Sequence, residues 1–168
     1  MKKSLCIGLV LWVSAGGYAQ QLNYQTISIF MYSFTKFVQW PEEANTGNFE
    51  MVVLGNSSII TELKSMAEKK KAGTRIIEVT KISSLAEFKK ANVLYVSNEW
   101  VAKHAEVAAK IGDQPTLIVT EQATGAMKGD INFYINKEGK LAFEINSPSV
   151  TKHRLKVSAD LVRFASTN

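Results

Sequence analysis

Few side chains in this 168-residue sequence have the chemistry of a catalyst. The two histidines, His104 and His153, are far apart in the chain, and neither has a second ligand three or four residues away, so no zinc motif results. The only cysteine, Cys6, lies near the N-terminus, and no Gly-x-Ser-x-Gly elbow is present. The carboxylates are scattered rather than paired. The sequence therefore predicts no catalytic residue, no metal site and no cofactor.

A predicted β-hairpin between Gly129 and Asn146 places the remaining polar candidates. Its turn, Asn-Lys-Glu-Gly, has the form of a type I turn closed by a G1 bulge, in which Gly139 supplies the positive φ angle. The turn sets Asn136 opposite Lys140, and every other pair follows by counting outward. One face of the hairpin then carries only apolar pairs: Ile135 with Leu141, Phe133 with Phe143, and Ile131 with Ile145. We expect this face to lie on a core.

The opposite face of the hairpin is mixed. Asn132 is set against Glu144, with Tyr134 beside them, and Asp130 is set against Asn146. Solvent exposure of a half-buried antiparallel edge is one explanation for these polar residues. A polar patch that contacts a ligand or partner is the other. In the second case, replacing Asn132 and Glu144 by alanine should leave stability nearly intact and weaken binding.

Strands and helices alternate along the rest of the chain. Short apolar runs predict strands at 49–55, 75–79, 93–96 and 116–120, and helical spacing predicts helices at 59–71, 85–90 and 98–111. Strict alternation implies βαβ crossovers. We predict an α/β fold, a single-domain three-layer sandwich with a mostly parallel sheet and an antiparallel hairpin at the edge. One or two helices follow, with Pro148 in the first turn of one and Ser158 as N-cap of the last.

The segment from Asn23 to Trp40 predicts a helix with an unusual surface. Its only charged residue is Lys36, although a surface helix usually has a charged outer face. A helix that is sunk in its own domain accounts for this composition. A helix that also forms a dimer or partner interface accounts for it too, and Phe30, Phe34 and Trp40 are then the candidate anchors.

Two further features have the chemistry to bind anions. Lys69 to Lys71 fall at the C-terminus of the second helix, where the macrodipole favours cations, and we expect a solvated helix end rather than a phosphate or membrane patch. The strand-glycine-helix turn at Gly55 lacks the further glycines and the lysine of a P-loop. We therefore do not expect a phosphate-binding loop there.

The N-terminal segment is typical of a secretory signal peptide. Two lysines precede an apolar run that is too short to span a bilayer, and Gly17-Tyr18-Ala19 fits the small-x-small rule for cleavage before Gln20. A retained anchor is the alternative, but no stop-transfer pattern follows. We predict that 1–19 are removed and that 20–168 form one domain in the periplasm. Losing two lysines lowers the formal net charge from +5 to +3, too small a surplus to indicate nucleic acid.

Six short strings of the predicted mature chain recur, in this order, in one known family. They are IFMYSFTKFVQWP (29–41), VVLG (52–55), LYVS (94–97), INF (131–133), FEIN (143–146) and LKVSADLVRFA (155–165). With them the chain resembles the YfiR-like family of periplasmic signalling regulators. Two features depart from that family. The mature chain lacks the cysteines that form disulfides in well-known members, and Lys128-Gly129-Asp130-Ile131 stands where Gly-Gly-Met-Ile is usual.

The resemblance implies a non-enzymatic α/β module, often a homodimer, that binds and restrains the periplasmic part of a membrane signalling protein. In the best-known members that protein is a diguanylate cyclase, and restraint lowers cyclic-di-GMP output and biofilm formation until an outer-membrane-associated partner removes the regulator. Other members occur beside sensor kinases. The alternative is a periplasmic small-molecule binding protein with a crevice near Gly55, Ser97 and Thr120. An enzyme would be indicated by activity lost on mutating His104 or His153.

Overall fold

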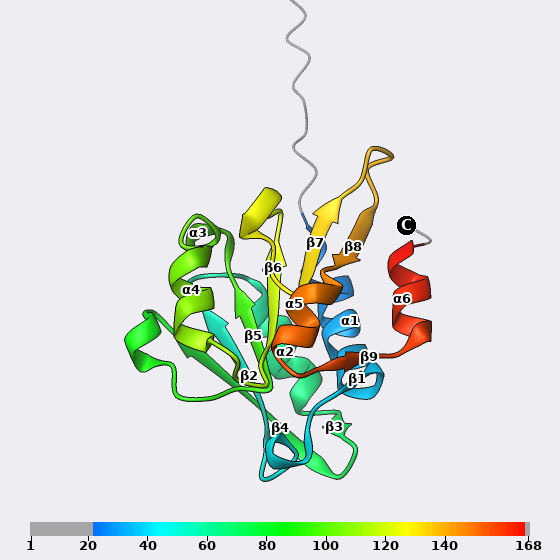
Figure 1. The fold of residues 1–168 in the computed structure, drawn as a ribbon. Helices are drawn as coiled ribbons and strands as arrows, with labels where there is room; N and C mark the ends of the chain where they lie inside the picture. The colour runs from blue at the N-terminus through cyan, green and yellow to red at the C-terminus, as the bar shows by residue number, and fades with distance from the viewer. Residues whose placement is uncertain (1–21, 167–168) are drawn as a thin grey trace, which may run out of the picture.

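A computed structural model describes residues 22–166 of the chain (Figure 1). The predicted signal peptide at 1–19 lies outside the described residues. The helices are α1 (Tyr24–Phe37), α2 (Ile59–Ala67), α3 (Asn98–Val101), α4 (His104–Ile111), α5 (Ser147–Lys152) and α6 (Ala159–Ser166), with single turns of 3-10 helix at Glu42–Ala44, Leu85–Glu87 and Gly125–Met127. The strands are β1 (Val38–Gln39), β2 (Phe49–Leu54), β3 (Lys71–Ala72), β4 (Arg75–Ile82), β5 (Val93–Val96), β6 (Leu117–Glu121), β7 (Ile131–Ile135), β8 (Leu141–Ile145) and β9 (Lys156–Val157).

A seven-stranded sheet organises this part of the chain, in the order β3-β4-β2-β5-β6-β7-β8. The strands β4, β2, β5, β6 and β7 are parallel to one another, whereas β3 and β8 are antiparallel strands at the two edges. This confirms the predicted α/β class with a mostly parallel sheet and a hairpin at one edge. β1 and β9 form a separate antiparallel pair that joins the end of α1 to the C-terminal segment.

Helices cover both faces of the sheet, so the hydrophobic residues form two cores (Figure 1). The larger core lies under α1 and α2, which contribute buried residues such as Met31, Phe34 and Leu63. The smaller core lies under α4, which buries Val107 and Ile111 against the opposite face. Three layers result because strands buried on both faces need a helix layer on each side.

The hairpin has the predicted register at every pair from Ile131–Ile145 to Ile135–Leu141. Gly139 has a φ angle of 76°, and its N–H donates to the Asn136 carbonyl at 2.9 Å. The predicted inner face lies on the larger core, where Phe133 and Phe143 are fully buried against Phe30 and Phe34 of α1. Of the two hairpin strands, only β8 runs antiparallel to the rest of this side of the sheet, because β7 joins β6 in parallel.

The first helix ends three residues before the predicted end at Trp40. Asn23 caps its N-terminus by accepting the Thr26 N–H at 2.9 Å. At the other end Val38 leaves the helix with extended φ and ψ angles and pairs with Val157 of β9. The β-branched Val38 prefers extended backbone, and its partner strand is more than 100 positions away in the chain. The helical spacing alone therefore predicted a helix that is too long at its C-terminal end.

Four other predicted elements differ from the structure. The helix expected at 98–111 is broken into α3 and α4, the segment 85–90 contains only one turn of 3-10 helix, and β4 extends to Ile82 rather than ending at Val79. Lys71 lies in β3 rather than at the end of α2. Helix ends and edge strands depend on neighbours in the fold, so local patterns place them least well.

Candidate functional site

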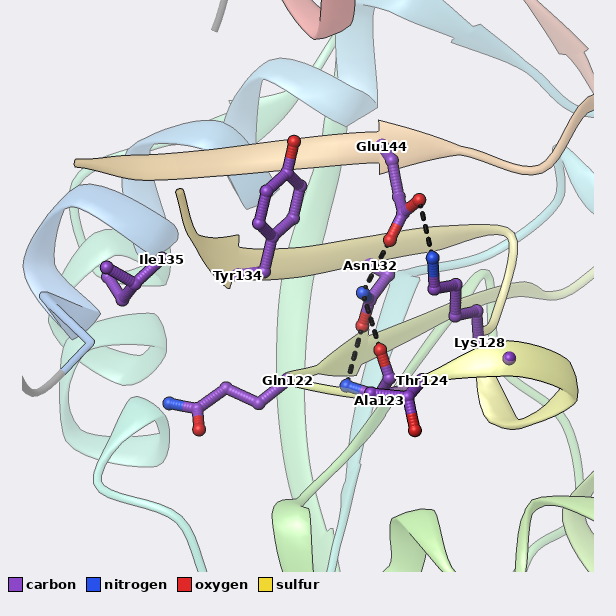
Figure 2. Close-up of a pocket in the computed structure, with 9 residues that line it drawn as sticks. Gln122, Ala123, Thr124, Lys128, Asn132, Tyr134, Ile135 and Glu144 are labelled. Atoms are coloured by element: carbon purple, nitrogen blue, oxygen red, sulfur yellow. Dashed lines mark hydrogen bonds and ion pairs between the residues drawn. The ribbon is translucent and has the colours of Figure 1, made fainter. Parts of the chain in front are cut away.

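An open hollow of about 560 Å³ lies on the outer side of the hairpin (Figure 2). It is bounded on one side by β7 and β8 and on the other by the loop that leaves β6. The lining residues are Gln122, Ala123, Thr124, Gly125, Lys128, Asn132, Tyr134, Ile135 and Glu144. Asn132, Tyr134 and Glu144 were predicted from the hairpin register, and the structure brings them together here.

Asn132 forms the floor of the hollow and is buried, with 1% of its surface exposed. Its side-chain oxygen accepts the Thr120 hydroxyl at 2.9 Å and the Ala123 N–H at 3.1 Å. Its side-chain nitrogen donates to the Ala123 carbonyl at 3.1 Å and to Glu144 at 2.8 Å. These four bonds occupy the amide, so we now expect alanine at Asn132 to reduce stability, in contrast to the expectation from the sequence. Asn132 holds the β6–β7 loop against the hairpin.

Glu144 is the charged group that faces the hollow. One of its carboxylate oxygens accepts the Asn132 amide, and the other lies 2.8 Å from the ammonium of Lys128. The Glu144 and Lys128 side chains are 39% and 33% exposed. An ion pair with this exposure contributes at most about 1 kcal/mol, so a partner can replace either member at little cost.

Tyr134 and Gln122 form the walls (Figure 2). Tyr134 is partly exposed, and its ring rises from β7 beside Glu144. Gln122 is exposed and has a φ angle of 53°, which is uncommon for a residue other than glycine. Its N–H donates to the Phe133 carbonyl at 2.7 Å and so holds the backbone in this conformation. Strained residues of this kind concentrate at binding sites.

The aromatic anchors proposed on the first helix occupy different environments. Phe34 has no exposed surface, and Trp40 is 8% exposed and donates its indole N–H to the Asn92 carbonyl at 3.1 Å. Both side chains are covered by the protein itself, so we do not retain them as partner contacts. Phe30 is partly exposed and packs edge-on against Phe143 at a ring separation of 5.2 Å. One face of α1 is therefore buried in its own domain, with Ile27, Ser28, Met31 and Phe34, and a partner contact through its other face stays a prediction.

The structure adds a buried carboxylate that the sequence analysis missed. Glu121, at the end of β6, is 2% exposed and accepts the Tyr95 hydroxyl at 2.6 Å and the Asn98 N–H at 3.1 Å. Burial, with Glu121 as the second cause, raises the pKa of Tyr95 well above its usual value. Asn98 begins α3, so Glu121 satisfies one of the free N–H groups at that helix end. The sequence signal that could have identified Glu121 is an acidic residue directly after an apolar strand.

Two of the three residues named for a small-molecule crevice at the strand ends do not face solvent in this structure. Ser97 and Thr120 are buried, and the Thr120 hydroxyl is bonded to Asn132. The Glu99 carboxylate accepts the Asn56 N–H at 2.7 Å, where a bound anion would accept it. A side chain at Gly55, whose φ angle is 88°, would collide with Ser97, Glu99 and Trp100.

The two histidines, distant in sequence, lie near the same buried aspartate. His153 Nδ1 lies 2.9 Å from both carboxylate oxygens of Asp130, and one of these oxygens also accepts the Ile118 N–H at 2.7 Å. Burial lowers the pKa of His104, with Asp130 opposing this and His153 adding to it. In residues 22–166 no three His, Cys, Asp or Glu side chains group as metal ligands.

A family model described as YfiR/HmsC-like matches residues 24–166, from the start of α1 to the end of α6. The comparison with curated proteins gave no match. In the described part of the chain, the helices are all too short or too polar to cross a bilayer.

Proposed function

Because the chain belongs to the YfiR/HmsC-like family, we propose that it is a periplasmic, non-enzymatic regulator that binds and restrains the periplasmic part of a membrane signalling protein. A diguanylate cyclase is the partner that the family favours, and a sensor kinase is the other candidate. The family match over residues 24–166 is the observation that carries this proposal. A homodimer and an outer-membrane-associated partner that removes the regulator belong to the same proposal.

The hollow on the hairpin is the contact surface that we propose for the signalling protein. It is open and lined by both polar and apolar atoms, and its partly exposed side chains, Tyr134, Glu144 and Lys128, can contact another protein surface. Tyrosine is a frequent anchor of such contacts, because a rigid ring buries a large area and its hydroxyl still forms a hydrogen bond. Asn132 has no spare hydrogen-bonding group and contributes by holding the floor in place.

Restraint by binding requires that the regulator prefers one state of its partner. The shift in the partner's equilibrium equals the difference in binding free energy between its two states, and a shift from 1:99 to 99:1 needs a difference of about 5.5 kcal/mol. A partner that removes the regulator from the signalling protein then needs only to compete for the same surface. A rim of weak ion pairs such as Lys128–Glu144 suits such reversible contacts.

In-cell crosslinking of the exported protein, followed by mass spectrometry of the captured proteins, tests this function. Wild-type protein should capture a membrane protein that carries a cyclase or kinase domain, and Tyr134→Ala should reduce that capture about tenfold or more, the loss typical of an anchor residue. Ile76→Ala is the matched control, because Ile76 is 58% exposed on β4, near the opposite edge of the sheet. Equal capture by Tyr134→Ala and wild type would show that the hollow is not the contact surface. Capture of no signalling protein would contradict the proposed function.

A further inference from the structure

Four exposed lysines gather at the C-terminal ends of α1 and α2: Lys36, Lys64, Lys69 and Lys70. The two helices pack side by side, so the lysines share one end of that helix layer. Glu62 and Glu68 are the acidic residues of the same segments, so four lysines and two glutamates leave a surplus of two positive charges. This cluster, the lysine face, carries much of the net charge of +3 predicted for the whole mature chain.

Tyr32 shows that these lysines converge from different parts of the chain. The ammonium of Lys36 lies 4.6 Å from the centre of the Tyr32 ring, and that of Lys70 lies 5.8 Å from the same point. Lys36 belongs to α1, whereas Lys70 follows α2. The ring face and the carbonyl ends of two helices favour positive charge here. Sequence spacing predicted a solvated helix end at 69–71, but it did not predict that Lys36 of α1 lies on the same surface.

The positive charges of the lysine face are not neutralised within the protein. None of the four lysines forms an ion pair with a carboxylate in residues 22–166. Like charges brought together repel one another, and an external anion relieves that repulsion. The face is therefore electrostatically complementary to a negatively charged partner.

The side chains on this face favour a lipid surface over a defined carboxylate site. All its cations are lysines, which act as flexible point charges, whereas specific recognition of carboxylates usually employs the planar fork of arginine. On α1 the exposed stripe also contains Ile29, with 61% of its surface exposed, one turn from Tyr32. An exposed aliphatic group, an aromatic ring and lysines on one helix layer are typical of proteins that lie on a membrane surface.

We propose that the lysine face, with Tyr32 and Ile29, binds the headgroup phosphates of an anionic phospholipid bilayer. This face lies on the α1–α2 side of the sheet, whereas the hollow lies on the side of the hairpin that points away from α1. Binding through the lysines therefore turns the hollow away from the lipid. The regulator would be concentrated at the membrane with its proposed contact surface free.

Vesicle sedimentation of the exported protein tests this proposal, with its amino terminus checked by mass spectrometry. Wild-type protein should bind vesicles that contain phosphatidylglycerol and should not bind vesicles of phosphatidylcholine alone, and raised salt should weaken the binding. Exchange of three lysines in Lys36→Gln/Lys69→Gln/Lys70→Gln should weaken it about 100-fold. The control Lys89→Gln/Lys110→Gln/Lys137→Gln removes the same charge from exposed positions elsewhere and should bind nearly as wild type.

Two results would overturn the proposal. One is equal binding of anionic vesicles by the two triple variants, with melting curves showing that both are folded. The other is binding of soluble polyglutamate as tightly as vesicles and with the same dependence on the three lysines, which would assign the face to an acidic protein. Neither result depends on the signalling partner, so failure here is distinguishable from failure of the proposed function.

Discussion

Asn132 and Glu144 are paired by the hairpin register, yet the protein uses them differently. Asn132 is buried and saturated with hydrogen bonds, whereas Glu144 is half-exposed and shares its carboxylate with Lys128. The register placed the two side chains opposite one another, but it carried no information on the β6–β7 loop that covers one of them. We therefore expect a stability role for Asn132 and propose a contact role for Glu144.

We expect Asn132→Ala to lower the free energy of unfolding by about 2–3 kcal/mol. The substitution leaves the buried N–H and C=O groups of Ala123 without their partners, and unpaired buried polar groups are costly. Glu144→Ala, which removes only a half-exposed ion pair and one hydrogen bond, should cost less than about 1 kcal/mol. Urea unfolding followed by circular dichroism measures both. Equal losses in the two variants would contradict this division of roles.

At the scale of elements, the hairpin depends on local interactions at its turn and on contacts with a distant helix along its strands. Its turn is built from adjacent residues, with Gly139 in the left-handed region at a φ angle of 76°. Its body is held by aromatic contacts with α1, for example between Phe133 and Phe34 at a ring separation of 6.1 Å. The turn sets the register, and the helix provides the core that keeps the apolar face buried.

Gly139→Ala should therefore destabilise the protein by about 1 kcal/mol, because a Cβ atom disfavours the left-handed region. Gly139→Asn is the matched control, since asparagine adopts this conformation more readily than alanine, and it should cost less. Thermal unfolding monitored by circular dichroism distinguishes the two variants. If alanine proves as stable as glycine, the positive φ angle is not what holds the register.

At the scale of the whole molecule, three distant segments bring titratable side chains within electrostatic range of one another. Asp130 begins the hairpin, His153 follows α5, and His104 begins α4. Asp130 and His153 are almost fully buried, and the Nε2 atoms of both histidines are buried without a hydrogen-bond partner among the described residues. Protonation of His104 would add a charge where the structure offers that nitrogen no acceptor.

We expect the protein to lose stability as the pH falls below the ordinary histidine pKa of 6.5. Burial lowers the pKa of His104 in the folded state, so below pH 6.5 the unfolded chain binds more protons than the folded chain. The free energy of unfolding then falls until the pH reaches the folded-state pKa, and above pH 6.5 this penalty is absent. Asp130 and His153 are the other titratable groups near His104.

Urea unfolding of wild-type protein and of His104→Gln between pH 5 and pH 7.5 measures this effect, in a range chosen around the ordinary histidine pKa. The variant should show a smaller loss of stability on acidification, because glutamine does not titrate. A loss in His104→Gln as large as that in wild type would assign the acid sensitivity to other groups.

The sequence by itself determined the features that neighbouring residues control. The Asn-x-x-Gly turn and the alternation of apolar residues predicted every pair of the β7–β8 register, and the alternation of strands and helices predicted the mostly parallel sheet. Tyr134 and Glu144 were placed on the candidate surface by the same register. These properties follow from periodicities of two and 3.6 residues and from local turn chemistry, which need no knowledge of distant segments.

Only the tertiary structure decided which of those residues are accessible. Phe34 and Trp40 became core residues, Asn132 was covered by the β6–β7 loop, and Tyr32 acquired lysines from two separate segments. Glu121 accepts a hydrogen bond from a tyrosine 26 positions away, and two histidines that are distant in the sequence lie near one aspartate. Burial and charge pairing depend on contacts between segments far apart in the chain, and no local pattern records those contacts.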